Sequence, residues 1–329
     1  MRDSCEGEDE QAQGSPKTGA TVEDVYVEEV GVSDSQEAEA APAEGEQSGE
    51  QSGELLVEDG DSSRIPCRSV GYAETGEKER SGPSLYQFLR LDIVKSRKLL
   101  QMVGKRIALP TPAAQPPEGS PLPAVIVINA QLPLENPSLF GQKLDGPTTN
   151  AVFFFGITEE TAAMAALPEE EQSNALRLLT RYWRDSAEDR SLQERMKLMA
   201  FCRNMQTFDG WLVKLIKGYN GKPVLLTKSG TLYRGATERF SYGGMDINMR
   251  CWAFPARKAL KTCATMIPQM ELHIALTTEG DPKREGKDDE LPEQVFGNFH
   301  ASNLPDIYGK DLMREEEYFE LFDAHEGHL

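Results

Sequence analysis

The sequence predicts an α+β fold, in which a largely antiparallel curved sheet with covering helices forms a single domain after a disordered acidic tail. Two observations lead to this prediction. Short apolar runs follow one another closely in the second half of the chain and Gly-rich turns separate several of them, which is typical of antiparallel sheets. Residues 1–63 hold 19 acidic and two basic residues, and so carry −17 of the net charge of −19. The predicted domain therefore spans residues 64–329.

The acidic tail lacks the apolar residues that a core needs. It is rich in Glu, Ser, Gly and Gln, and cannot bury enough apolar surface to offset chain entropy. We expect residues 1–63 to be disordered and their removal to leave folding intact. The rest of the chain is near neutral, with 35 acidic and 33 basic residues, so the domain can still bind anions.

The first part of the domain contains three kinds of pattern. In Leu85–Leu109, apolar residues alternate irregularly with basic ones, which favours a helix over part of that length. Pro110–Pro123 is too rich in Pro for helix or sheet and is predicted to be an exposed loop. The apolar runs Ala124–Ile128 and Val152–Phe155 predict two buried strands.

The middle of the domain begins with the clearest helical pattern. Glu169–Arg184 has an acidic first turn, followed by Leu176, Leu179 and Trp183 at helical spacing. The next apolar segment, Arg195–Phe201, fits a strand by its alternation and a helix by its Ala and Met content, and both remain open.

Short strands and two further helices are predicted for the remainder. Pro255–Thr265 begins with Pro and exposes Arg257, Lys258 and Lys261, which predicts a helix. The final helix is predicted at Leu312–Phe322. The strand candidates are Trp211–Lys217, Pro223–Leu226, Thr231–Arg234, Met245–Met249 and Met270–Leu276.

A series of short phrases occurs in a characteristic order between Arg64 and Asn298. These phrases are Pro83–Tyr86, Leu91–Ser96, Ala108–Pro110, Ala124–Pro133, Arg195–Leu198, Gly210–Lys214, Gly221–Leu226, Tyr233–Gly235, Met245–Ile247 and Glu290–Gly297. Their order resembles the C-terminal domain of the plant Enhanced Disease Resistance 2 family, a domain of unknown function. The chain departs from the family pattern at Met199–Ala200, where Pro is usual, and at Asn248–Arg250, where small hydroxyl residues are usual. Glu159–Arg190 is also expanded.

The resemblance implies an association with membranes. Plant members usually carry a phosphoinositide-binding pleckstrin homology domain and a lipid-binding START domain ahead of this one, and they act in defence signalling. A tail of 63 residues is too short to encode those domains, so we expect this chain to lack them and any lipid specificity that they supply.

The sequence contains no recognisable catalytic motif. The common nucleotide-binding, zinc-protease and hydrolase templates are missing. His273 lies among apolar strand residues, which favours a satisfied strand histidine over a catalytic base. The carboxylates of Asp288–Glu290 and Glu293 suggest a hard-cation site less well than a loop followed by a capped helix start. We therefore expect no enzyme activity and no cofactor.

Composition also restricts the cellular location. The five cysteines include no C-x-x-C pair, which indicates a reduced compartment, and the N-terminal residues do not form a secretory signal. No apolar stretch approaches the roughly 20 residues of a membrane-spanning helix. The expected location is cytoplasmic and peripheral on membranes.

Basic residues in the part that resembles the family's central sheet are the best binding candidates. Trp211 and Asp246 join them because the resemblance and the strand pattern point to the same two positions. The predicted ligand-binding residues are Arg195, Lys197, Trp211, Lys214, Arg234 and Asp246. A solvated sheet face would explain the charges equally well, and Asp246 could instead form a structural salt bridge with Arg234 or Arg250.

Two functions remain open at this point. The first is a non-catalytic, lipid- or membrane-associated module in lipid signalling or trafficking, whose basic residues contact anionic headgroups. A cavity lined by Phe153, Phe155, Trp211 and Leu225 would support it. The alternative is a protein-interaction adaptor that uses the acidic tail, where Thr21–Asp24 offers a site for an acidophilic kinase. Nucleic acid is not an expected partner, because aromatic residues are sparse among the basic ones.

Overall fold

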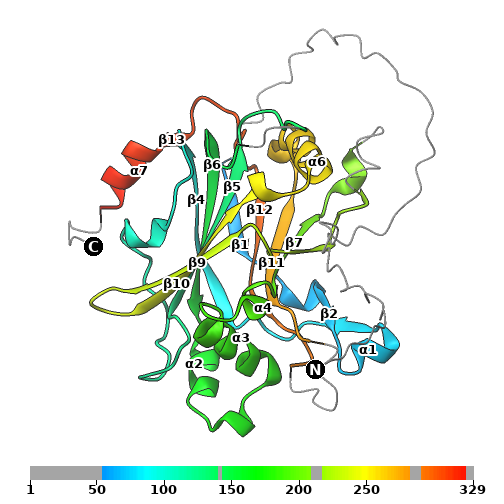
Figure 1. The fold of residues 1–329 in the computed structure, drawn as a ribbon, viewed down its shortest axis with the longest axis vertical. Coiled ribbons are helices and arrows are strands. Elements are labelled where there is room, and N and C mark those ends of the chain that lie inside the picture. The colour runs from blue at the N-terminus through cyan, green and yellow to red at the C-terminus, as the bar shows by residue number, and fades with distance from the viewer. Residues whose placement is uncertain (1–53, 140–142, 209–216, 282–289, 324–329) are drawn as a thin grey trace, which may run out of the picture. The chain divides into compact units, whose positions relative to one another are not determined.

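The computed structural model describes residues 54–139, 143–208, 217–281 and 290–323 (Figure 1). Two larger sheets and a two-stranded ribbon form this part of the chain. Helices α2 and α3 lie at one end of the sheets, and α6 lies at the other end (Figure 1). The strand predicted from Trp211 lies outside the described residues, except for Lys217.

The first sheet has the strand order β1-β12-β11-β7-β8, and all its neighbouring strands are antiparallel. The β7 strand resolves the ambiguity of Arg195–Phe201, because pairing with β11 on one side and β8 on the other fixes an extended backbone there. The strands are β1 (Leu56–Asp59), β12 (Val295–Ser302), β11 (Leu272–Thr278), β7 (Met196–Cys202) and β8 (Pro223–Leu225).

The second sheet has the order β13-β4-β6-β5-β10-β9. Its β13–β4 and β5–β10 pairs are parallel and the other pairs are antiparallel. The strands of this sheet are β13 (Met313–Arg314), β4 (Tyr86–Ser96), β6 (Thr148–Ile157), β5 (Val125–Pro133), β10 (Ser241–Asn248) and β9 (Gly230–Ala236). The separate two-stranded ribbon consists of β2 (Pro66–Arg68) and β3 (Lys78–Arg80). The largely antiparallel α+β class is thus confirmed, with the strands divided between two sheets.

The helix predicted at Glu169–Arg184 is confirmed as α3 from Asn174 onward, whereas its expected acidic first turn is a separate 3₁₀ turn at Glu169–Glu171. α3 places Leu176, Leu179 and Trp183 on its buried face, and the Ser173 hydroxyl accepts a hydrogen bond from the Leu176 amide at 3.2 Å. The helices are α1 (Tyr72–Thr75), α2 (Glu159–Ala165), α3 (Asn174–Asp185), α4 (Arg190–Gln193), α6 (Phe254–Ala264) and α7 (Glu315–Leu321). Short 3₁₀ turns lie at Ser62–Arg64, Val103–Lys105, Glu169–Glu171, Met205–Thr207, Met249–Cys251 and Ile267–Gln269. The predicted helices at Pro255–Thr265 and Leu312–Phe322 are therefore confirmed.

The partly helical reading of Leu85–Leu109 is wrong. Its longest element is the 11-residue strand β4, which pairs with β6 along its whole length, and its helical content is limited to the 3₁₀ turn Val103–Lys105. A bulge between Phe88 and Arg90 interrupts the two-residue alternation, so the apolar positions no longer show a strand period. The Pro-rich segment after it has no helix or strand, as expected.

Aromatic side chains from both sheets meet in the main core. The ring centroid of Phe299 on β12 lies 4.9 Å from that of Phe153 on β6 and 5.0 Å from that of Phe88 on β4. The strands approach so closely that a Cβ on Gly297 would come within 2.8 Å of the Phe155 ring. Phe153 and Phe155 thus fill the space between the sheets and do not line the lipid cavity that we considered.

The boundary at residue 63 is also wrong. Leu56–Asp59 is strand β1, which pairs with β12 and covers its outer edge. The side chain of Asp59 then accepts a hydrogen bond from the Phe88 amide at 2.7 Å, which joins this segment to the second sheet. The folded part of the chain therefore begins before Arg64.

Candidate functional site

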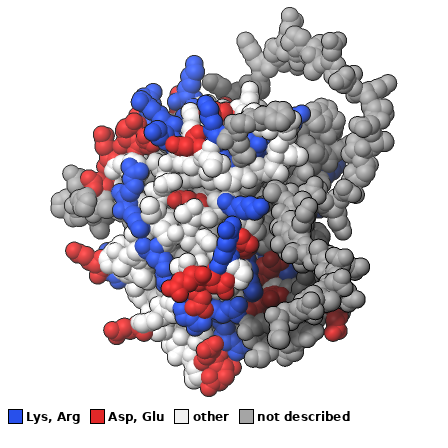
Figure 2. Space-filling view, in the orientation of Figure 1, with Lys and Arg blue, Asp and Glu red and all other residues white. Residues whose placement is uncertain are grey.

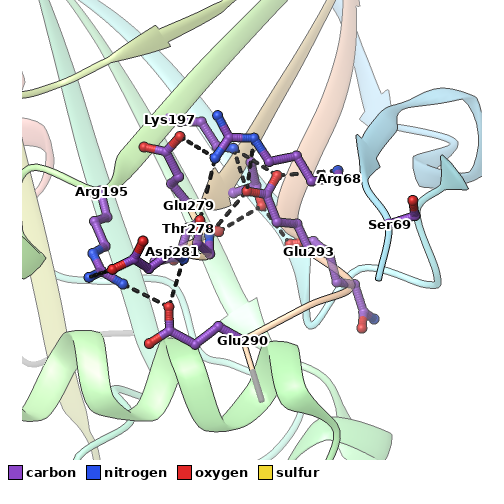
Figure 3. Close-up of polar contacts among 12 residues, drawn as sticks. Arg68, Ser69, Arg195, Lys197, Thr278, Glu279, Asp281, Glu290 and Glu293 are labelled. Atoms are coloured by element: carbon purple, nitrogen blue, oxygen red, sulfur yellow. Dashed lines mark hydrogen bonds and ion pairs between the residues drawn. The ribbon is translucent and has the colours of Figure 1, made fainter. Parts of the chain in front are cut away.

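Two of the predicted ligand-binding residues lie in a network of ion pairs (Figure 3). Arg195 precedes β7 and contacts Glu290 at 2.8 Å and Asp281 at 3.5 Å. Lys197 on the same strand donates to both carboxylate oxygens of Glu293 at 2.7 Å. The structure thus brings Arg195 and Lys197 together, with carboxylates as their neighbours.

Two further arginines complete this ion-pair network. Arg181 on α3 contacts Glu290 at 2.5 Å, and Arg68 on β2 contacts Glu279 at 2.5 Å. Among the described residues, the four cations of this network each have a carboxylate partner, so their charges are compensated within the protein. Burial raises the pKa of Glu290, but the Asp281 amide and the two neighbouring arginines outweigh this effect and lower it. The network joins α3, β2 and β7 to the segment before β12, and it supports the fold.

Arg234 and Asp246 lie away from this network and also contact the protein itself. Arg234 on β9 donates to the carbonyl oxygen of Trp183 at 2.6 Å and to that of Pro121. It holds the Pro-rich loop against the end of α3. Trp211 and Lys214 lie outside the described residues.

Asp246 has a structural environment different from the one expected. Its side chain, on β10, is 4% exposed and accepts a hydrogen bond from the Met102 amide at 2.7 Å, with Asn129 at 3.4 Å. Burial raises its pKa to about 6, against the opposing effect of these hydrogen bonds. Among the described residues it forms no ion pair, so the salt bridge with Arg234 or Arg250 is wrong. Asp246 instead fixes the segment that follows β4.

A pocket of about 320 Å³ lies beside α6, at the end of β5. Figure 2 shows Lys and Arg side chains gathered at the same upper end of the molecule. Four cations and one carboxylate are among the residues that line the pocket. The lining includes Leu132, Pro133, Glu135, Asn136, Pro137, Ser138, Lys143, Arg250, Arg257, Leu260, Lys261, Ile307 and Tyr308.

Helix α6 supplies two of these cations from one face, because Arg257 and Lys261 are four residues apart. Arg257 donates to the carbonyl oxygen of Ser138 at 3.1 Å, and Lys261 donates to that of Leu134 at 3.0 Å. The Lys261 ammonium also lies 3.6 Å from the centroid of the Tyr308 ring. Burial lowers the pKa of Lys261. Both cations are thus held in place before any ligand arrives.

Arg250 forms the deepest part of the basic lining. It is 4% exposed, pairs with Glu135 and donates to the carbonyl oxygen of Pro147 at 2.6 Å. Its buried Nε has no hydrogen-bond partner among the described residues. Gly146 passes so close that a Cβ there would lie 3.0 Å from the Glu135 carboxylate, and its φ of +150° suits glycine.

The fourth cation, Lys143, is exposed and forms no ion pair with a described residue. Phosphate groups are bound by fixed guanidinium and ammonium groups of this kind. The pocket can therefore accept a phosphate-sized anion. No histidine or cysteine is among the described residues that line the pocket.

Only part of this pocket is indicated by the sequence. The pattern of Pro255–Thr265 predicts Arg257 and Lys261 on one helix but exposed, whereas both are half-buried against the segment that follows β5. Arg250 stands where the family pattern has small hydroxyl residues, so a departure from the pattern places a cation in the pocket.

The comparison with protein families gives a match over most of the described fold. The family described as Protein ENHANCED DISEASE RESISTANCE 2, C-terminal matches residues 58–304. The chain belongs to this family. The matched range holds both large sheets except β13 and the first two residues of β1, together with the ion-pair network and most of the pocket. Ile307 and Tyr308, which close one side of the pocket, lie just beyond that range.

The other comparisons add no relative. Neither the curated proteins nor the solved structures gave a match. In the described part of this family member, no helix has the length and apolar character needed to cross a bilayer.

Proposed function

We propose that this chain is a non-catalytic module that associates with membranes and binds an anionic lipid headgroup in the pocket beside α6. The observation that carries the proposal is the excess of positive charge around this pocket, where four cations face one carboxylate. A phosphorylated headgroup fits both the charge and a volume of about 320 Å³.

Preorganisation supports the same function. Arg257 and Lys261 are held by carbonyl oxygens, so they lose little side-chain freedom when an anion binds. Arg250 adds the positive charge of a guanidinium that its contacts with Glu135 and the Pro147 carbonyl oxygen hold in place. Lys143 at the exposed edge can approach a headgroup from the solvent side.

A binding role, and not a catalytic one, agrees with the chemistry of the site. His273, the histidine considered as a base, is 3% exposed, and its Nε2 lies 2.7 Å from the Asn298 side-chain oxygen. Burial lowers its pKa. Its contact with Asn298 joins β11 to β12, and His273 is not among the residues that line the pocket.

Vesicle co-sedimentation tests the proposal. The chain should bind phosphatidylcholine vesicles that contain a phosphatidylinositol bisphosphate and should not bind vesicles of phosphatidylcholine alone. Lys143→Glu should weaken binding about tenfold or more, since it reverses an exposed charge at the pocket. The matched control is Lys78→Glu on β3, which makes the same charge change on the ribbon.

Two results would contradict the proposal. One is an absence of binding to every vesicle composition, and the other is equal weakening by Lys143→Glu and Lys78→Glu. Because exposed charges are screened by salt, binding should also decrease as ionic strength rises.

A further inference from the structure

Two exposed leucines flank the pocket on the connection between β5 and β6. Leu139 is 63% exposed and Leu144 is 59% exposed. A single exposed leucine is ordinary on a protein surface, but these two lie on one connection, on either side of the cation Lys143. Their common position requires a separate explanation.

The backbone beside both leucines is fixed by hydrogen bonds. The carbonyl oxygen of Ser138 accepts from Arg257 at 3.1 Å, and that of Leu144 accepts from Asn248 at 2.9 Å. The leucine side chains thus stay exposed on anchored backbone.

Further cations lie against the same connection. The Leu99 amide donates to the Asp145 carboxylate at 2.8 Å, which places the turn after β4 beside Leu144. This turn exposes Arg97 and Lys98. The Leu99 hydrogen bond is the main cause that lowers the pKa of Asp145, and the charges of Lys98 and Arg250 act in the same direction. Exposed apolar and basic groups therefore alternate at this end of the molecule.

We propose that this end is a membrane-docking face, in which Leu139 and Leu144 enter the interfacial layer of an anionic bilayer while Arg97, Lys98 and Lys143 contact its headgroups. The inference rests on the proposed function, and it specifies the partner as a bilayer surface and the orientation of the module on it. The pocket then opens toward the membrane, with its headgroup ligand still attached to the lipid.

Charge complementarity favours an anionic bilayer as the occupant of this face. Each basic residue near an anionic membrane strengthens binding about fivefold, so three exposed cations contribute appreciably. Peripheral proteins commonly need both an apolar and a basic contribution for stable attachment. An apolar protein partner would instead leave the cations beside Leu139 and Leu144 without counter-charges.

The test separates headgroup binding from insertion. The full chain, a Leu139→Ser/Leu144→Ser double variant and a Leu167→Ser control are compared on phosphatidylcholine vesicles with phosphatidylserine and a phosphatidylinositol bisphosphate. Leu167 is 44% exposed and follows α2, at the end opposite α6 (Figure 1). Calorimetry with soluble inositol bisphosphate measures the pocket alone.

The double variant should lose about tenfold or more in vesicle affinity, keep its affinity for soluble inositol bisphosphate, and differ from Leu167→Ser. Unchanged vesicle affinity in the double variant would overturn the docking face and leave the proposed function standing. No binding of the unaltered chain to vesicles or to inositol bisphosphate would overturn both.

A second variant measures directly whether the side chain at position 144 enters the bilayer, and this measurement does not require a loss of binding. Leu144→Trp should show additional fluorescence quenching by vesicles with brominated acyl chains, compared with the unaltered chain. The absence of additional quenching in a variant that still binds vesicles would overturn the proposed orientation.

Discussion

Replacing Lys197 by Met should destabilise the fold strongly, because it leaves a buried carboxylate without its cation. The Lys197 side chain is 5% exposed and that of Glu293 is 2% exposed, with 2.7 Å between the ammonium and the carboxylate. Removing one member of such a buried pair typically costs about 3 to 5 kcal/mol. The geometry leaves few other partners for this charge.

The expected cost lies near the lower end of that range. After the substitution, the Glu293 carboxylate still accepts a hydrogen bond from the Gly280 amide at 3.0 Å, and the Nε of Arg68 lies 3.9 Å away. These contacts compensate part of the buried, unpaired negative charge, so we expect the free energy of unfolding to fall by about 3 kcal/mol.

Urea denaturation of the variant, the unaltered chain and a Lys78→Met control measures this change. The control removes an exposed lysine and should shift the free energy of unfolding by less than about 0.5 kcal/mol. A Lys197→Met/Glu293→Gln double variant should recover part of the loss, because a neutral amide replaces the isolated carboxylate. If Lys197→Met behaves like the control, the ion-pair network does not support the fold and Lys197 returns as a ligand-binding candidate.

Three further predictions concern other parts of the molecule. Burial raises the pKa of Asp246 from 3.8 to about 6, so the folded state holds that proton more tightly than the unfolded chain does. Stability should therefore decline as the pH rises from about 4 to about 6, and Asp246→Asn should remove that decline in thermal midpoints measured across this window. Glu135→Gln should raise the affinity for inositol bisphosphate about fivefold in calorimetry, since it removes the one carboxylate that competes for the pocket's cations; unchanged or weaker affinity would count against the pocket. Gly243→Ala should lower the free energy of unfolding by about 1 to 3 kcal/mol, because its Cβ would lie 2.4 Å from the Trp183 ring, and an unchanged denaturation midpoint would show that this contact yields easily.

Local pattern predicted the elements whose burial is regular. The run Ala124–Ile128 lies in a strand with both faces covered, and the helix that contains Leu176 and Leu179 buries one face, so apolar spacing was sufficient for both. The strand β4 was missed because its bulge breaks the alternation and because pairing with β6, which no local pattern reveals, determines its backbone.

The candidate site depends more than the helices and strands do on contacts between residues that are far apart in the sequence. The sequence pattern indicates free cations at Arg195 and Lys197, because their partners, Glu290 and Glu293, are 95 and 96 residues away in the sequence. The pattern predicts that one of the two glutamates caps a helix start, whereas both lie in the turn and loop that precede β12. The two cations and the two glutamates all lie in sequence phrases that resemble the family. The resemblance therefore points to residues that meet in the structure, but it does not show that their charges neutralise each other.

The pairing of β1 with β12 determines where this chain can be shortened. An uncovered strand edge presents a row of free amide and carbonyl groups, and a second copy of the chain can add a strand there. Removing residues 1–63 would take away Leu56–Asp59 and leave the β12 edge in that condition. A shortened chain should therefore retain Glu54, whose carbonyl oxygen accepts a hydrogen bond from Asn303 at 3.2 Å, if it is to resist aggregation.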